Sequence, residues 1–350
     1  MRKPIALLSL IAFGCIWLSL QGNDITKINR NNKILVAYVE EERSSTPDPF
    51  NFSHLIYAFG RINNKFNGVT ITNERKLKDL SGLKTINPDL QVILGIGSSN
   101  PSEFSEMTKD KTRRNNFINS CKQIIEKYGL DGIDLDWEFP GINKETNTNE
   151  SENYALLVKE LREALGKDKW ISFYSNNSGK WIDFHKMLPY VDYVNVSGYN
   201  LSVPKSDTKL NHQSPLYPSK KYGKWCIEKS IARHNQLGVP YEKILLGIPF
   251  YGRGKKPFPG YLDCNKFSKY EDGTTLHWDE DAKVPYRLDK DGNLVLSFDD
   301  EKSIEEKCNF IEKKGLAGVF VWNYDSDYSD HRLAKKLHRC IKFLNDSINR

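Results

Sequence analysis

Short apolar runs alternate with longer amphipathic stretches along most of the chain. The apolar runs are rich in Val, Ile and aromatic residues and are mostly bounded by Gly, Pro or Asn, which is typical of strands buried on both faces of a parallel sheet. Eight such strands are predicted, over Ile34–Val39, His54–Phe59, Gln91–Ile96, Gly132–Trp137, Trp170–Ser175, Tyr193–Gly198, Ile244–Pro249 and Gly318–Trp322. Helical periodicity between them is clearest in Thr112–Lys127, Ser151–Leu165, Trp225–Gln236 and Asp300–Lys314.

This order of elements predicts the fold class. Eight strand-then-helix units within about 300 residues indicate an α/β fold, a (β/α)₈ TIM barrel. A doubly wound open sheet is the alternative. No G-x-G-x-x-G sequence follows the first strand, which weakens the dinucleotide-binding version of that alternative.

The stretch Lys255–Ser297 does not fit a single strand-helix unit. It is long, contains Gly and Pro, and includes Trp278 and Tyr286. We therefore predict an insertion with strands of its own between barrel strands seven and eight, inside a catalytic domain over residues 33–345. Insertions at the carboxyl ends of barrel strands usually shape the rim of an active site.

Composition and charge narrow the class of protein. Of 350 residues, 39% are hydrophobic and 27% are charged, so the chain can bury a full core. The net charge of +6 is spread along the sequence, whereas a nucleic-acid-binding protein would need a clustered basic face. Seven Trp, 17 Tyr and 17 Phe suit a core, and they also suit a groove in which sugar rings stack on aromatic side chains.

The N-terminus has the pattern of a secretory signal peptide. Arg2 and Lys3 precede a run without charge from Ile5 to Leu20, and we expect cleavage to remove residues 1–22. An uncleaved membrane anchor is an alternative, although the run falls short of the ~20 apolar residues of a spanning helix. Lipid attachment at Cys15 is another. The chain is expected to be secreted or extracytoplasmic, without stable insertion in a membrane.

Five cysteines follow this segment, and they show no metal-binding spacing. They are Cys121, Cys226, Cys264, Cys308 and Cys340, an odd number without a C-x-x-C pair. Up to two disulfides or a set of buried free thiols are both compatible with the sequence. No metal and no other cofactor is expected.

The candidate chemistry lies in one short strand, whose sequence from Asp131 to Glu138 is DGIDLDWE. Period-two alternation places Asp134, Asp136 and Glu138 on one face and Ile133, Leu135 and Trp137 on the other. In a closed barrel the acidic face points into the interior. Three inward carboxylates are costly to bury and repel one another, so a merely structural strand would hardly contain them.

Two other interpretations of this strand are weaker. An edge strand with a solvated acidic face conflicts with the apolar alternate positions and with the buried strands on either side in the sequence. A calcium loop would need a Gly at its sixth position and a Glu at its twelfth. Carboxylates about 7 Å apart raise at least one pKa, which lets an acid stay protonated near neutral pH. Glu138, at the carboxyl end of the strand, is the predicted proton donor.

At these residues the chain resembles glycoside hydrolase family 18, the chitinase family, whose signature is D-x-x-D-x-D-x-E. Further similarities follow in the same order along the chain, at Ala37-Tyr38, His54–Phe59, Tyr199, Ser214–Tyr217, Gly247–Arg253 and Trp322. The resemblance extends over about residues 33 to 340. It implies that Glu138 is the acid/base and that Asp136 orients the acetamido group of the substrate.

The resemblance also implies roles for the residues around this pair. Asp134 would exchange a proton or a hydrogen bond with Asp136, and Tyr199 would bind the acetamido carbonyl. Trp322 would form the floor under the cleaved sugar. The residues expected to bind substrate are Tyr38, Phe59, Trp137, Asn200, Tyr251, Arg253 and Trp322.

Two positions depart from the family pattern. Gly95 replaces a Ser that would help to hold Asp134, and Asn200 replaces an Asp. Neither change removes the acid. They are expected to affect activity, its pH dependence or the sugars accepted, because Asn200 keeps hydrogen-bonding capacity without a charge.

The resemblance implies a secreted, retaining, chitinase-type hydrolase that cleaves β-1,4-N-acetylglucosamine linkages in chitin or chitooligosaccharides with help from the substrate acetamido group. An endo-β-N-acetylglucosaminidase acting on N-glycans, a peptidoglycan-directed enzyme and a weakly active chitin-binding lectin are the alternatives. We expect a monomer whose partners are N-acetylglucosamine oligosaccharides and do not include nucleic acid.

Overall fold

The computed structural model describes residues 32–98, 100–141, 149–202 and 209–348. The predicted signal peptide and Cys15 lie outside these residues. Among the helices of the described ranges, none is long and apolar enough to cross a membrane.

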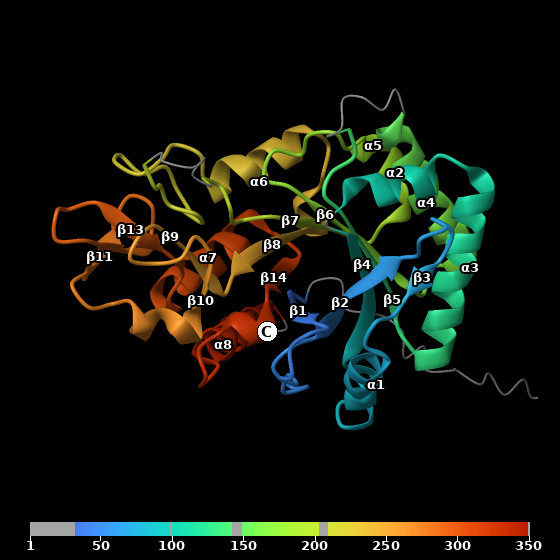
Figure 1. Ribbon diagram of the computed structural model, residues 1–350, viewed down its shortest axis with the longest axis horizontal. Coiled ribbons are helices and arrows are strands. Elements are labelled where there is room, and N and C mark those ends of the chain that lie inside the picture. Colours follow the sequence, from blue (N-terminus) through green and yellow to red (C-terminus); the bar gives the residue numbers. More distant parts are fainter. Residues whose placement is uncertain (1–31, 99, 142–148, 203–208, 349–350) are drawn as a thin grey trace, which may run out of the picture. The chain divides into compact units, whose positions relative to one another are not determined.

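Eight parallel strands form a closed barrel (Figure 1). They are β1 (Ile34–Glu40), β2 (His54–Ile62), β4 (Gln91–Ser98), β5 (Gly132–Trp137), β6 (Trp170–Ser175), β7 (Tyr193–Val196), β8 (Ile244–Pro249) and β14 (Gly318–Trp322). Each strand pairs with the next, and β1 closes the ring by pairing with both β14 and β2. This confirms the predicted (β/α)₈ barrel. Every predicted strand is found, with differences only at the carboxyl ends of β1, β2, β4 and β7.

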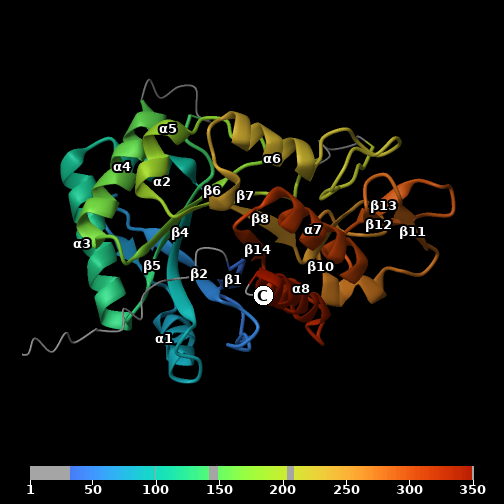
Figure 2. The ribbon, with the colours of Figure 1, turned by 180° about the vertical axis from the view of Figure 1, so that it is seen from behind.

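Helices cover the outer face of the barrel, as Figures 1 and 2 show. They are α1 (Glu74–Gly82), α2 (Pro101–Thr108), α3 (Lys111–Tyr128), α4 (Glu150–Leu165), α5 (Phe184–Met187), α6 (Ile227–Gln236), α7 (Glu301–Lys314) and α8 (Arg332–Ile348). The sequence sets several of their ends. The Asp110 side chain caps the N-terminus of α3, and Gly129 ends that helix in the left-handed conformation. Asp300 and Gly315 do the same for α7.

The alternation of side chains along the strands separates two apolar layers. One layer lies between strands and helices and includes Ile133, Leu135 and Trp137 of β5. The other fills the barrel interior and includes Tyr38 of β1 and Phe320 of β14. Asp134 and Asp136 are buried on the interior side, as the period of two requires.

The predicted insertion is a separate antiparallel sheet between β8 and α7. Its strands are β9 (Tyr251–Gly254), β10 (Leu262–Asp263), β11 (Thr275–Asp279), β12 (Val284–Leu288) and β13 (Leu294–Ser297), in the order β10-β9-β13-β12-β11. It begins at Tyr251, four residues before the predicted Lys255. Because β9 follows β8 almost directly, the side chains of Tyr251 and Arg253 lie at the carboxyl ends of the barrel strands.

Candidate active site

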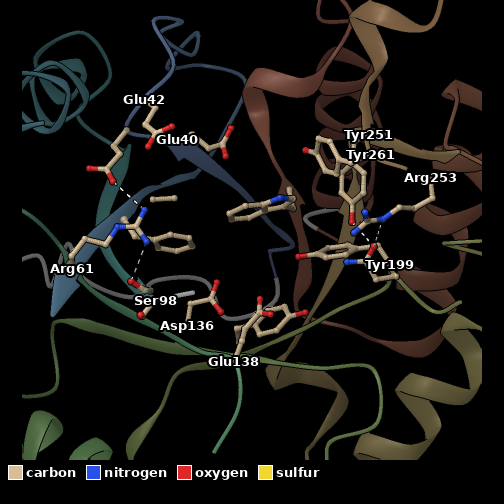
Figure 3. Close-up of a pocket in the computed structure, with 17 residues that line it drawn as sticks. Glu40, Glu42, Arg61, Ser98, Asp136, Glu138, Tyr199, Tyr251, Arg253 and Tyr261 are labelled. Carbon is tan, nitrogen blue, oxygen red and sulfur yellow. Dashed lines mark hydrogen bonds and ion pairs between the residues drawn. The ribbon is translucent and has the colours of Figure 1, made fainter. Parts of the chain in front are cut away.

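A cavity of about 520 Å³ opens at the carboxyl ends of the barrel strands (Figure 3). Its walls come from strand ends and from the insertion. The lining residues are Glu40, Glu41, Glu42, Ala58, Phe59, Arg61, Gly97, Ser98, Asp136, Glu138, Tyr174, Tyr199, Asn200, Tyr251, Arg253, Tyr261 and Trp322. Segments that are far apart in the sequence therefore meet here, as in other barrel enzymes.

Asp134 lies at the bottom of the site, fully buried, with three hydrogen-bond donors around it. Tyr38 Oη donates to Oδ2 at 2.7 Å, and Ser172 Oγ and Asn195 Nδ2 donate to Oδ1 at 2.6 and 2.9 Å. Burial raises the pKa of Asp134 to about 6, although the hydrogen bonds from Ser172 and Tyr38 oppose this rise. The same burial holds the pKa of the Tyr38 hydroxyl well above 10, so Tyr38 remains a neutral donor.

Asp136 is the next inward residue on β5 and has a different environment. Its side chain is buried, and its Oδ1 atom has no hydrogen-bond partner among the residues that the structure describes. Burial first, then the charges of Glu138 and Asp134, raise its pKa well above the usual range, while Arg61 lowers it. No hydrogen bond joins Asp134 to Asp136 among the described contacts, so the two carboxyl groups influence each other through charge alone.

Glu138 ends the row at the mouth of the cavity. It remains accessible to solvent, yet the protein packed around it raises the pKa of its carboxyl group by desolvation. A raised pKa keeps this carboxyl protonated at a higher pH than an ordinary Glu. The geometry thus supplies an accessible acid beside a buried carboxyl group with one unpaired oxygen.

Aromatic rings form the floor and one wall. Trp322 stacks on Phe59, with ring centres 5.6 Å apart and an interplanar angle of 17°, and lies 5.5 Å from the Tyr38 ring. Tyr199 lies edge-on to Tyr251 at 6.0 Å. Such a floor presents one flat apolar face to the cavity, the surface that a pyranose ring needs.

Asn200 organises the wall beside the insertion. Its Oδ1 atom accepts hydrogen bonds from Tyr251 Oη at 2.9 Å and Arg253 Nε at 2.8 Å. An Asp at this position would add a charge next to Arg253. With Asn, the guanidinium keeps a neutral acceptor, and its positive charge stays available to the cavity.

One predicted substrate contact requires correction. Trp137 does not line the cavity: it is 1% exposed, stacks on Phe104 at 5.3 Å and contacts Tyr154 at 5.1 Å. The reason is the strand period, because Trp137 lies between the inward Asp136 and Glu138 and so points under the helices. The other predicted site residues lie in the cavity or, for Asp134 and Tyr38, directly beneath it.

Two residues that support Asp134 were missing from the sequence prediction. Ser172 on β6 provides the hydroxyl donor that the sequence lacks at Gly95. A side chain has no room at Gly95, because a Cβ atom there would lie 2.6 Å from the Tyr57 carbonyl oxygen. Asn195 on β7 is a lone polar residue between Val194 and Val196, and this break in an apolar run was a detectable signal.

Among the described residues, no group of three or more His, Cys, Asp or Glu side chains is arranged to bind a metal ion. The five described cysteines, Cys121, Cys226, Cys264, Cys308 and Cys340, are free thiols. This agrees with one of the two arrangements that the sequence left open.

Comparisons with known proteins agree with this geometry. The chain is 28% identical to mouse Chitotriosidase-1 over 319 residues, which are 80% of the chain and 68% of the mouse protein. It is 27% identical to Chitinase A1 of Niallia circulans over 297 residues, 72% of the chain and 42% of that protein. A glycoside hydrolase family 18 N-acetylglucosaminidase from Paenibacillus barengoltzii has a similar structure, with a TM-score of 0.79 at 28% identity, covering 88% of the chain and all of that structure.

A match to a protein family also covers most of the chain. The sequence profile of Glycosyl hydrolases family 18 matches residues 34–327, from the first barrel strand to the turn that follows the last. Together with the closed barrel and the acidic strand in its cavity, this match shows that the chain belongs to glycosyl hydrolases family 18 and is a glycosidase.

Proposed function

We propose that this glycosidase cleaves β-1,4-N-acetylglucosamine linkages in chitin or chitooligosaccharides by substrate-assisted, retaining hydrolysis. The observation that supports this most directly is the unpaired Oδ1 of Asp136 beside the acid Glu138. Buried polar atoms in proteins almost always have partners. The N–H of an acetamido group on the bound sugar would complete the pair.

The charges favour the acetamido group over a protein nucleophile. Asp136 is buried, and burial and the charges of Glu138 and Asp134 raise its pKa, so its anion is favoured only when a positive charge lies beside it. In the proposed reaction the acetamido oxygen attacks the anomeric carbon while Glu138 donates its proton to the leaving oxygen. Positive charge then develops on the acetamido group, and Asp136 stabilises it as an anion. Water, deprotonated by Glu138, opens the cyclic intermediate.

The aromatic residues fit the same substrate. Trp322 would support the sugar whose bond is cleaved, and the Tyr199 hydroxyl would donate to the acetamido carbonyl. The names of the relatives, a chitotriosidase, a chitinase and an N-acetylglucosaminidase, support this substrate class.

We also propose that the protein is exported. The support is the sequence pattern of the first 22 residues, a basic start followed by an uncharged apolar run. N-terminal sequencing of protein recovered outside the cytoplasm should find a start between about residues 19 and 25. Met1 at the start of exported protein would contradict cleavage.

The main experiment compares N-acetylated and fully deacetylated oligosaccharides of equal length. Only the acetylated series should be cleaved, and NMR should show the β-anomer first, because two inversions restore the configuration. Rapid cleavage of the deacetylated series, or α-anomer as the first product, would require a separate protein nucleophile. Parallel assays on an N-glycoprotein and on peptidoglycan test the alternative substrates.

The Glu138→Gln variant tests the role of Glu138 as the proton donor. The amide keeps the size and hydrogen bonding of the side chain but has no acidic proton, so turnover should fall by at least ~10²–10⁴-fold with the fold unchanged. The matched control is Glu163→Gln on the exposed side of α4, which should leave turnover unchanged. Activity of Glu138→Gln within about tenfold of the parent would remove Glu138 from its role.

A further inference from the structure

We propose that Glu40, fixed by an ion-paired bridge with Arg43 and Asp263, limits the cavity on the side of the non-reducing sugar. The enzyme would then release single N-acetylglucosamine units from the non-reducing ends of chains. This inference rests on the proposed function, because it concerns the direction in which the same substrate enters the same site.

The position of Glu138 sets that direction. The acid must lie next to the glycosidic oxygen on C1 of the sugar above Trp322. In a pyranose ring C4 lies opposite C1, so the 4-hydroxyl points to the wall across the cavity from Glu138. Figure 3 shows Glu40 and Glu42 on that opposite wall, away from Asp136 and Glu138.

Glu40 is placed there by the barrel itself. It is the last residue of β1 and lies two positions after Tyr38, whose hydroxyl points inward to Asp134, so Glu40 faces the same side one level higher. Its backbone N–H donates to Asp325 Oδ2 at 3.2 Å, which joins the end of β1 to the segment after β14.

Arg43 extends this wall to the insertion. Its Nε atom lies 3.2 Å from Glu40 Oε2, and its Nη2 atom lies 3.3 Å from Asp263 Oδ2. Asp263 is 2% exposed and also accepts from Lys266 Nζ at 2.6 Å and Ser326 Oγ at 2.9 Å. A carboxylate held by three partners is not easily displaced. The bridge thus links three separate segments of the chain and holds Glu40, which is the member of the bridge that lines the cavity.

The chemistry of the bridge suits a chain end. The Glu40 carboxylate can accept a hydrogen bond from a free 4-hydroxyl group. A further sugar attached to that oxygen would have to displace Glu40 from the cavity wall, against its ion pair with Arg43 and its backbone hydrogen bond to Asp325. A terminal N-acetylglucosamine is therefore accepted, and an internal one is rejected.

The opposite end of the cavity has no comparable bridge among the described residues. Phe139, directly after Glu138, stacks on Tyr174 at 5.9 Å and on Trp181 at 6.1 Å. Trp181 is 41% exposed. These rings lie on the side of the acid, where the leaving part of the chain must lie, and they provide flat faces for its sugars.

The test uses the full-length protein and chitohexaose labelled at its reducing end. The expected early products are free N-acetylglucosamine and labelled pentamer, followed by labelled tetramer. A second hexamer, with its terminal 4-hydroxyl methylated, should be cleaved at least about tenfold more slowly. Disaccharide or labelled trimer among the first products, or equal rates for the capped hexamer, would overturn the inference. Absence of cleavage of every acetylated oligomer would instead contradict the proposed function.

Arg43→Ala tests the bridge directly. Opening it should raise the initial ratio of disaccharide to monosaccharide by about tenfold and reduce discrimination against the capped hexamer. Arg75→Ala, in an exposed pair on α1 with 91% of the Arg side chain accessible, is the control and should keep the parental products. A monomer-only pattern in folded Arg43→Ala would show that the bridge does not set the product. The capped substrate on the parent enzyme decides the inference even where a variant fails to fold.

Discussion

The hydrogen bonds around Asp134 show how a residue outside the acidic motif controls its chemistry. Ser172 comes from β6 and Asn195 from β7, yet both donate to the same carboxylate oxygen. Burial favours the protonated form of Asp134, while the Ser172 hydrogen bond favours the anion. The balance leaves the pKa of Asp134 raised to about 6.

Ser172→Ala should shift the acid limb of the pH profile of kcat/KM to higher pH. Without the hydroxyl donor the anion of Asp134 loses a stabilising partner, so its pKa rises further above about 6. In the proposed reaction this anion helps to stabilise positive charge on the substrate, so the rate near pH 5 should fall more than the rate near pH 8. Normalised profiles of variant and parent that superimpose would contradict this role.

At the scale of residues, the sequence predicted which acidic side chains share one face better than it predicted their hydrogen-bond partners. The row Asp134, Asp136 and Glu138 follows from a period of two and needs no tertiary information. The hydrogen-bond partners of Asp134 do not follow from this period, because Tyr38 and Asn195 are 157 residues apart in the chain. Trp137 was assigned to the substrate by its chemistry, although the same period places it outside the barrel.

At the scale of elements, a buried ion pair helps to fix α7 in the fold. Lys307 and Asp299 form an ion pair in which both side chains are completely inaccessible, and Lys307 Nζ also donates to Ser214 Oγ at 2.7 Å. Ser303 Oγ donates to the same Asp299 oxygen at 2.7 Å. A pair of this kind gives little net stability, but losing one partner leaves the other as an isolated buried charge.

Lys307→Met should therefore destabilise the fold by about 3–5 kcal/mol. Met keeps most of the volume of the Lys side chain, so the loss of stability would come from the uncompensated charge of Asp299 and not from a cavity. Urea denaturation measures it, with Lys159→Met on the exposed pair with Glu163 as the control, expected within about 0.5 kcal/mol of the parent. Equal stability of the two variants would mean that water or a rearranged donor satisfies Asp299.

The elements were predicted where their patterns are long or fully apolar. All eight barrel strands and the four helices with clear periodicity were found. The predictions omitted α1, α2 and α5, which are short and so offer too few turns for a clear period. They also omitted α8, an exception to this rule, because its 17 residues are long enough to show one. The strands of the insertion are short and partly exposed, and the sequence indicated their presence without their bounds.

At the scale of the whole molecule, we propose that the cavity has two unlike ends, one limited by Glu40 and one bordered by the rings of Phe139 and Trp181. The second end should matter only for substrates long enough to reach it. We expect Trp181→Ala to raise KM for chitohexaose about fivefold, as loss of about 1 kcal/mol of stacking implies, and to leave an aryl N-acetylglucosaminide unaffected.

Steady-state kinetics on both substrates checks this expectation. Equal effects on the short and the long substrate would place Trp181 in the general packing around Phe139, without a role in binding the leaving chain. The exposed Phe343→Ala on α8 provides a control for the loss of a surface ring.

The barrel and its insertion could be predicted from the order of elements alone, because eight strand-helix units leave few other topologies. The ion-paired bridge that holds Glu40 could not be predicted from the sequence. Glu40, Arg43 and Asp263 occur in segments without any motif, and 220 residues separate Arg43 from Asp263. Only the closed ring brings them together.

That closure also has a consequence during synthesis. The first strand, β1, completes its pairing only when β14 joins it, and Lys33 just before β1 bonds through its backbone to Asn345 in α8. A growing polypeptide on the ribosome has its acid, Glu138, long before it has Trp322. The ring must therefore form late, through contacts of β1 with β14 and of Lys33 with α8, and such long-range contacts are slow to form. Hydrolytic activity would then appear only after β14 and α8 have been synthesised, which makes the appearance of turnover a kinetic signal for closure of the ring.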